Sequence, residues 1–206
     1  MTSTFKQLKK NDINIIAVVH DDVPELTRKT IYADYFEPLV RELESFTERK
    51  VNVVFAGGEP QSNFEYKGDD IDETARRWAP LGESLLEDMI NEGLAINNLT
   101  LVILLTKELL KGTLTDLFDE QVLGSSLWDS SGHPGAFALA SLLTYRTVGY
   151  QVGLFLGAKP EDAETQFNGW FAETYMMQAR DPVKSNSYTF SAANRKNITN
   201  FLANKD

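Results

Sequence analysis

The stretch TVGYQVGLFLGAKPED, residues 147 to 162, decides how the chain is interpreted. It is almost wholly apolar up to Gly157, and Tyr150 and Leu154 stand four residues apart, so they share one face of a helix. Gly157 is placed to end that helix, and Pro160 follows three residues later. The spacing therefore predicts a buried helix that presents Tyr150 and Leu154 side by side.

The wider segment 135–158 is apolar enough to require comparison with a membrane helix. It contains one charged side chain, Arg146, near its middle. An arginine at the centre of a membrane helix costs roughly 2.5 kcal/mol or more on insertion scales. We therefore expect a buried helix of a globular protein and no membrane partner.

Composition restricts the classes of function. The chain has 206 residues, of which 42% are hydrophobic and 24% are charged, and we predict one domain over residues 1–206. The formal net charge of −10 opposes binding to nucleic acid or to an anionic membrane. The absence of cysteine excludes disulfides, thiol catalysis and thiolate metal sites.

The first residues carry lysines but no apolar run followed by a small-residue cleavage site. Without a recognisable secretory signal, the default expectation is a cytoplasmic location. Export without a leader would leave no mark in the sequence.

The order of elements predicts an α/β fold. Three apolar runs rich in β-branched residues or leucine alternate with two amphipathic stretches, which is typical of parallel strands joined by helical crossovers. The third run is continuously apolar and is expected at the centre of the sheet. The predicted strands are 13–19, 51–60 and 99–106, and the predicted helices are 22–50, disturbed near Pro38, and 70–93.

Two further elements are predicted in the second half of the chain. Residues 122–128, VLGSSLW, are polar and contain glycine, as is typical of a short edge strand. Near the end, Ser191 is suited to cap a helix that has Ile198, Phe201 and Leu202 on one face.

The stretch 147–162 resembles the active-site helix of metzincin zinc proteases, in particular of the reprolysin and adamalysin type. Their motif is H-E-x-x-H-x-x-G-x-x-H, in which two histidines four apart share a zinc ion and the glutamate activates water. When Gly157 is set as the motif glycine, Tyr150, Leu154 and Pro160 occupy the three histidine positions, and Gln151 occupies that of the glutamate.

The resemblance extends over nearly the whole chain. VLGSSLWDSSGHPGAFALAS, residues 122–141, is similar to the family's edge strand and the strand that precedes its active-site helix. ETYMMQ, residues 173–178, is similar to the methionine-containing Met-turn, with Met176 or Met177 as its methionine. The end of the chain resembles that of reprolysin-like domains.

This resemblance implies a zincin-like fold. Its parts are a mostly parallel twisted sheet with an antiparallel edge strand, two crossover helices, a degenerate active-site helix, a Met-turn and a C-terminal helix.

The resemblance also implies that the zinc-dependent chemistry of the family has been lost. Leucine and proline side chains cannot bind zinc, glutamine is a neutral amide, and a tyrosine with its usual pKa near 10 is a poor sole ligand.

Other polar groups give weaker signals. His20 follows the first strand, beside two aspartates, where α/β proteins place ligands, although such a histidine is usually structural. His133 lies in a Gly/Pro turn. The acidic residues of 66–73 lack the spacing of a calcium loop and are explained by capping of the next helix.

The leading hypothesis is a catalytically inactive protease-like protein, without a cofactor or metal, that binds a protein or peptide in the former substrate cleft. Strand edges can pair with extended peptides, and the expected edge here is Gly124, Ser125, Ser126, Leu127 and Trp128. One alternative is an active hydrolase with a rearranged metal site that uses Tyr150, Glu161, Asp162 or His20. Another is an α/β domain unrelated to proteases, with neither a cleft above the helix nor a tight turn at Met177.

Overall fold

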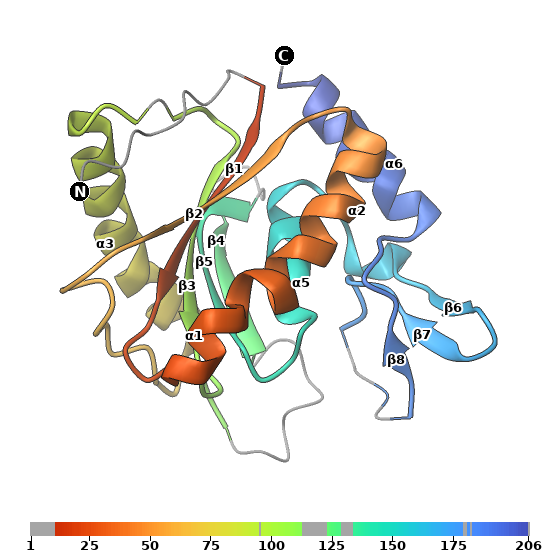
Figure 1. The fold of residues 1–206 in the computed structure, drawn as a ribbon, viewed down its shortest axis with the longest axis horizontal. Coiled ribbons are helices and arrows are strands. Elements are labelled where there is room, and N and C mark those ends of the chain that lie inside the picture. The colour runs from red at the N-terminus through yellow and green to blue at the C-terminus, as the bar shows by residue number, and fades with distance from the viewer. Residues whose placement is uncertain are drawn as a thin grey trace.

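The computed structural model describes residues 11–94, 96–112, 123–128, 134–178, 181 and 183–205 (Figure 1). In chain order the elements are β1 (Ile13–Val19), α1 (Glu25–Ile31), the π-helix η1 (Tyr32–Phe36), α2 (Glu37–Thr47), β2 (Val51–Ala56), α3 (Ile71–Asn91), β3 (Thr100–Thr106), β4 (Gly124–Trp128), β5 (Pro134–Ser141), α5 (Thr147–Phe155), the 3-10 helix η3 (Pro160–Asp162), β6 (Thr165–Phe167), β7 (Phe171–Glu173), β8 (Ser185–Asn186) and α6 (Ala192–Ala203).

The main sheet has the strand order β2-β1-β3-β5-β4. Strands β2, β1, β3 and β5 pair in parallel, and β4 pairs antiparallel with β5 at the edge. The continuously apolar strand β3 lies at the centre, and residues 124–128 form the antiparallel edge. Both placements confirm the sequence predictions.

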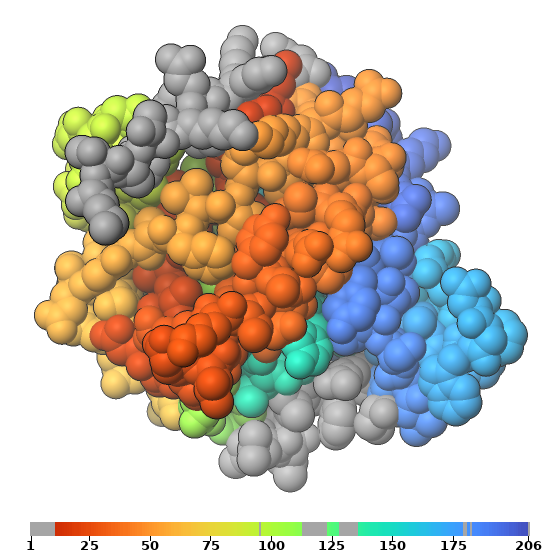
Figure 2. All heavy atoms as spheres, viewed as in Figure 1, coloured from red at the N-terminus to blue at the C-terminus, as the bar shows by residue number. Residues whose placement is uncertain are grey.

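Helices cover both faces of this sheet because its strands are apolar on both sides. In β3, Leu101, Ile103 and Leu105 pack into the core shared with α2, α5 and α6, whereas Val102 and Leu104 pack into the core beneath α3. Figure 1 shows α3 on one side of the sheet and α2 and α5 on the other. In Figure 2, α1, α2 and α6 cover much of the face turned to the viewer.

The first crossover is interrupted just before Pro38, as predicted. The chain forms α1, then one π-helical segment at Tyr32–Phe36, and α2 begins at Glu37. Proline lacks the N–H group that would continue the α-helical hydrogen bonds, so the pattern changes at this point.

Residues 135–158 do not form the one buried helix expected from their apolar character, but the strand and helix that the family resemblance implied. Residues 134–141 form β5, and only 147–155 form a helix. Ala138, Leu139 and Ala140 are fully buried as β5 pairs with β3. Pairing with neighbouring strands, rather than helical periodicity, therefore determines the secondary structure of the first part of this segment.

Among the described residues, no helix has both the length and the apolar character needed to cross a membrane.

The last third of the chain adds a small sheet and a terminal helix. Strands β6, β7 and β8 are each two or three residues long and form a sheet of their own. This sheet was not expected from the sequence, because such short strands show no alternation. Helix α6 begins as predicted, with Ser191 Oγ accepting a hydrogen bond of 3.1 Å from the Asn194 N–H group.

Candidate functional site

Helix α5 is held close to its neighbours by two glycines on one face. A Cβ atom on Gly149 would lie 2.3 Å from the ring of Tyr175. A Cβ atom on Gly153 would lie 2.6 Å from Met176 Sδ and 2.7 Å from the ring of Phe190. Any larger residue at either position would clash with these side chains. The two glycines therefore determine how closely α5 packs against them.

A tight turn lies beneath α5 at Thr174–Met177. The Met177 N–H group donates to the Thr174 carbonyl oxygen at 3.2 Å. Met176 is fully buried with its sulfur against Gly153, whereas Met177 is partly exposed. Of the two predicted methionines, Met176 is therefore the one that supports the helix.

The far end of α5 turns at Gly157, whose φ of +85° is readily adopted only by glycine. A Cβ atom there would also lie 3.0 Å from Phe201 Cβ. This turn carries the chain to Pro160, so that Tyr150, Leu154 and Pro160 all line one cleft.

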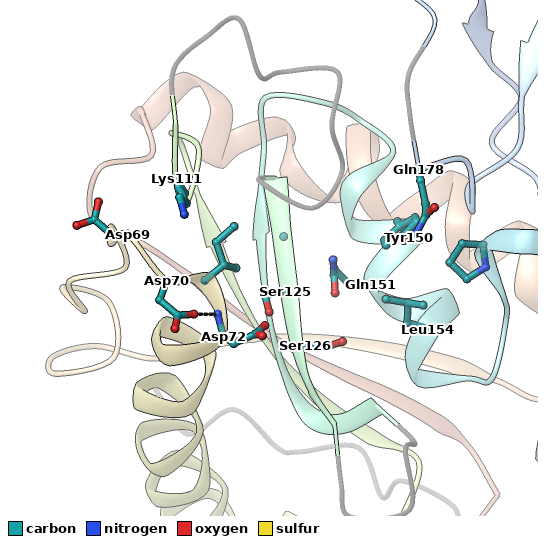
Figure 3. A pocket seen from close by; sticks show the side chains of 13 residues that line it. Asp69, Asp70, Asp72, Lys111, Ser125, Ser126, Tyr150, Gln151, Leu154 and Gln178 are labelled. Carbon is teal, nitrogen blue, oxygen red and sulfur yellow. Dashed lines mark hydrogen bonds between the residues drawn. The ribbon is translucent and has the colours of Figure 1, made fainter.

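That cleft has a volume of about 590 Å³ and extends from α5 across the edge strand to the start of α3 (Figure 3). Figure 3 places Tyr150, Gln151 and Leu154 on α5, facing β4, with Asp70 and Asp72 beyond the strand. The lining residues are Asp69, Asp70, Ile71, Asp72, Lys111, Gly124, Ser125, Ser126, Tyr150, Gln151, Leu154, Pro160 and Gln178.

The cleft brings together side chains from segments that lie far apart in the sequence. Of the predicted edge, Gly124, Ser125 and Ser126 line it, whereas Leu127 borders a smaller cavity between β4 and α3. The Trp128 side chain and His133 lie outside the described part of the structure. An unrelated α/β domain was expected to have neither a cleft above this helix nor a tight turn at Met177, and both are present.

Two buried polar atoms at the cleft have no hydrogen-bond partner among the described residues. They are Oε1 of Gln151, whose residue is 1% exposed, and Oγ of Ser126, whose residue is 6% exposed. The amide of Gln151 is pressed against the strand, since a Cβ atom on Gly124 would lie 2.6 Å from its Nε2 atom. Unmet buried polar atoms are uncommon because each costs about 1–3 kcal/mol.

The residues at the positions that resemble the family's zinc-ligand positions do not fit zinc. Leu154 and Pro160 have no donor atom, and Gln151 is a neutral amide in the place of a base. Over the described ranges, no group of three or more histidine, aspartate or glutamate side chains is placed to hold a metal ion.

The residues of the rearranged-site alternative lie apart. Tyr150 lines the cleft, but His20, Glu161 and Asp162 are not among its lining residues. Glu161 is exposed, and Asp162 Oδ2 accepts a hydrogen bond of 2.6 Å from Asn197.

His20 belongs to a separate network at the end of β1. Its Nδ1 atom lies 2.8 Å from Asp22 Oδ1, and its Nε2 atom lies 3.0 Å from the Phe64 carbonyl oxygen. Burial alone would raise the pKa of Asp22, but hydrogen bonds from Tyr66, His20 and the Lys107 amide outweigh it and lower that pKa. These contacts tie β1 to the segment that follows β2 and to the residue after β3.

Sequence reasoning missed the acidic border of the cleft. Asp70 does cap α3 as expected, accepting hydrogen bonds of 2.9 and 3.1 Å from the Asp72 and Glu73 N–H groups. The acidic residues that predicted this cap do not indicate that the start of α3 lies beside β4. Lys111, which also lines the cleft, carried no signal, and Gln178 was noted only as the last residue of the Met-turn segment.

Comparison with known proteins identifies the fold. No family of known sequences matches the chain, and no curated protein matches it in sequence. Among solved structures, it is similar to the crystal structure of metalloproteinase-II from Bacteroides fragilis, with a TM-score of 0.60 and 12% identity.

The alignment covers 96% of this chain and 55% of the Bacteroides protein, so the chain spans about half the length of that metalloproteinase. At 12% identity the likeness concerns the fold alone. With its mostly parallel sheet and flanking helices, the chain has a metalloprotease-like fold.

Proposed function

We propose that this protein is a protease-like binding protein without zinc-dependent hydrolysis, which holds an extended segment of a partner protein in the cleft along β4. One observation carries the proposal. The cleft combines an edge strand with the helix positions where a metalloprotease of this fold would need histidines, and those positions hold Tyr150, Leu154 and Pro160.

The lining argues against hydrolysis by the metal mechanism. That mechanism requires nitrogen, sulfur or oxygen ligands for zinc and a base for the attacking water. Leu154, Pro160 and Gln151 supply neither of these. The apolar pair Tyr150 and Leu154 occupies the space with groups that need no metal and modestly stabilises the helix.

The edge of β4 supports the binding role. Within the described residues, β4 pairs with β5 on one side and with no strand on the other. A strand at the edge of a sheet can pair with an added strand, which is a common way to hold an extended peptide. Such pairing uses backbone hydrogen bonds and does not depend on a metal.

The packing beneath the cleft supports an ancestry shared with active enzymes. Met176 lies under α5 in a tight turn, as the Met-turn of the metzincin family does, and we assign it that role. A protein that needs the shape of the cleft, but not its chemistry, would keep this support.

A selection with random 12-residue peptides displayed on phage tests the proposal. We expect enriched peptides to bind the wild-type chain and to slow hydrogen exchange along 124–127. The variant Ser125→Tyr, which places a large side chain in the cleft, should lose them. The control Ser45→Tyr makes the same change on the exposed side of α2 and should bind normally.

Two results would contradict the binding proposal: failure to enrich any peptide, or protection confined to another face. Peptidase activity that requires a bound metal and is abolished by Tyr150→Phe would support the rearranged hydrolase instead.

A further inference from the structure

We infer that the segment held in the cleft is basic, and that a lysine or arginine side chain lies between the start of α3 and Gln151. This inference rests on the proposed function, since it specifies the ligand of the same cleft. It is carried by the charge along the cleft together with two buried oxygen atoms that have no hydrogen-bond partner among the described residues.

The charge along the cleft is negative. Three carboxylates, Asp69, Asp70 and Asp72, border it against one ammonium group, Lys111. Asp70 is occupied with capping α3 and lies 3.9 Å from Arg76. The exposed carboxylates of Asp69 and Asp72 have no ion pair or hydrogen bond among the described residues. They are therefore available to a cation, and the net charge of −10 attracts cationic segments over a longer range.

Two oxygen atoms at the floor of the cleft lack the hydrogen bonds that buried polar atoms normally make. Oε1 of Gln151 and Oγ of Ser126 are both buried and unpartnered among the described residues. A guanidinium group carries five N–H donors and an ammonium group three, and neither accepts a hydrogen bond. A basic side chain would thus supply the missing donors, and hydrogen bonds to a charged group are stronger than neutral ones.

The remaining wall suits the stem of such a side chain. Leu154 and Pro160 are apolar, and Tyr150 contributes an aromatic ring. Lysine and arginine characteristically lay their aliphatic stems on apolar surface while the charged group reaches polar partners. Their charged groups also pack on aromatic rings.

The phage selection gives the first readout. We expect peptides that require an open cleft, and so fail to bind Ser125→Tyr, to contain lysine or arginine well above its frequency in the unselected library. In the tightest of these peptides, arginine is then replaced by citrulline, which keeps the shape but removes the charge. We expect affinity, measured by fluorescence anisotropy, to fall about tenfold or more at low salt, and the difference to shrink as salt is added.

Variants of the chain test which residues produce the preference for arginine over citrulline. The double variant Asp69→Asn, Asp72→Asn should lose most of the preference for arginine over citrulline. The matched control Glu87→Gln, Asp88→Asn removes two exposed charges from the far end of α3, about 22–24 Å along the helix at 1.5 Å per residue, and should keep it. Gln151→Met should weaken binding of the arginine peptide, and Gln151→Glu should strengthen it.

The outcomes separate this inference from the function on which it rests. Enriched peptides that use the cleft but contain no excess of lysine or arginine, or that bind equally well with citrulline, would overturn the inference and leave peptide binding intact. Failure to enrich any peptide would overturn both. Equal loss of preference in the two double variants would show a general effect of charge and remove the assignment to this cleft.

Discussion

Arg146 and Glu173 form a buried ion pair that joins the start of α5 to the end of β7. Nη1 of Arg146 donates to Oε2 of Glu173 at 2.7 Å, and the two side chains are 1% and 3% exposed. Oε1 of the same glutamate accepts a hydrogen bond of 3.1 Å from the Asp181 N–H group. The charge that argued against a membrane helix thus connects the cleft helix to the strand just before the Met176 turn.

Replacing Glu173 with alanine should destabilise the protein severely. The change leaves the Arg146 charge buried without this partner, which typically costs about 3–5 kcal/mol. Urea unfolding followed by circular dichroism measures the loss. The control Glu25→Ala breaks an exposed pair with Lys29 (3.5 Å) and should cost less than about 1 kcal/mol. Similar losses in the two variants would mean that the buried pair has no special role.

Gly149→Ala should destabilise the protein even though alanine favours helices. The new methyl group would lie 2.3 Å from the Tyr175 ring, and overpacking of this kind typically costs about 1–3 kcal/mol. The higher helix propensity of alanine would stabilise the folded state by at most about 1 kcal/mol. Gly58→Ala is the matched control, because a Cβ atom there meets nothing within 4 Å. Thermal unfolding of both variants checks the prediction, and a Gly149→Ala variant as stable as wild type would refute the close packing.

Asp22 should make stability depend on pH in the acid range. Its pKa is lowered in the folded state, so the carboxylate stabilises the fold at pH values above its ordinary pKa of about 3.9. That contribution is lost as the pH falls through the lower, folded-state pKa. Asp22→Asn should therefore be less stable than wild type at pH 6, and the difference should narrow steadily towards pH 2. A difference that stays constant over this range would contradict the account.

Placing histidines at the three motif positions should create a zinc site. Tyr150, Leu154 and Pro160 line one cleft, and the turn at Gly157 supplies the required change of direction. The triple variant Tyr150→His, Leu154→His, Pro160→His should bind one zinc ion per chain in calorimetric titration. The double variant that keeps Pro160 should bind zinc more weakly, because it lacks one ligand. A triple variant without zinc affinity would indicate that the three positions do not converge on one point.

Sequence reasoning recovered the elements whose pattern is local. The apolar runs gave β1 and β3, Pro38 marked the change of helix type, and Ser191 marked the start of α6. The apolar character of 135–158 favoured one buried helix, whereas the family resemblance placed a strand before the helix, and β5 is settled by pairing with β3 and β4, which no local pattern reveals.

In the candidate site too, features set by the local sequence could be predicted, and features set by contacts between distant segments could not. The spacing within residues 150–160 was enough to predict which residues share a helix face and which follow its end. The acidic border could not be predicted, because Asp69 and Asp72 reach the cleft only through the crossover that places α3 beside β4. The unmet oxygen of Gln151 likewise depends on how closely Gly124 allows the strand to approach α5.

The most direct test of the central claim is the metal content of the purified chain, measured by elemental analysis after preparation without chelator and again after zinc addition and desalting. We predict no stoichiometric metal in either sample, because the residues at the ligand positions cannot hold it. About one tightly bound metal ion per chain, lost in Tyr150→Phe, would contradict the account and support a rearranged catalytic site.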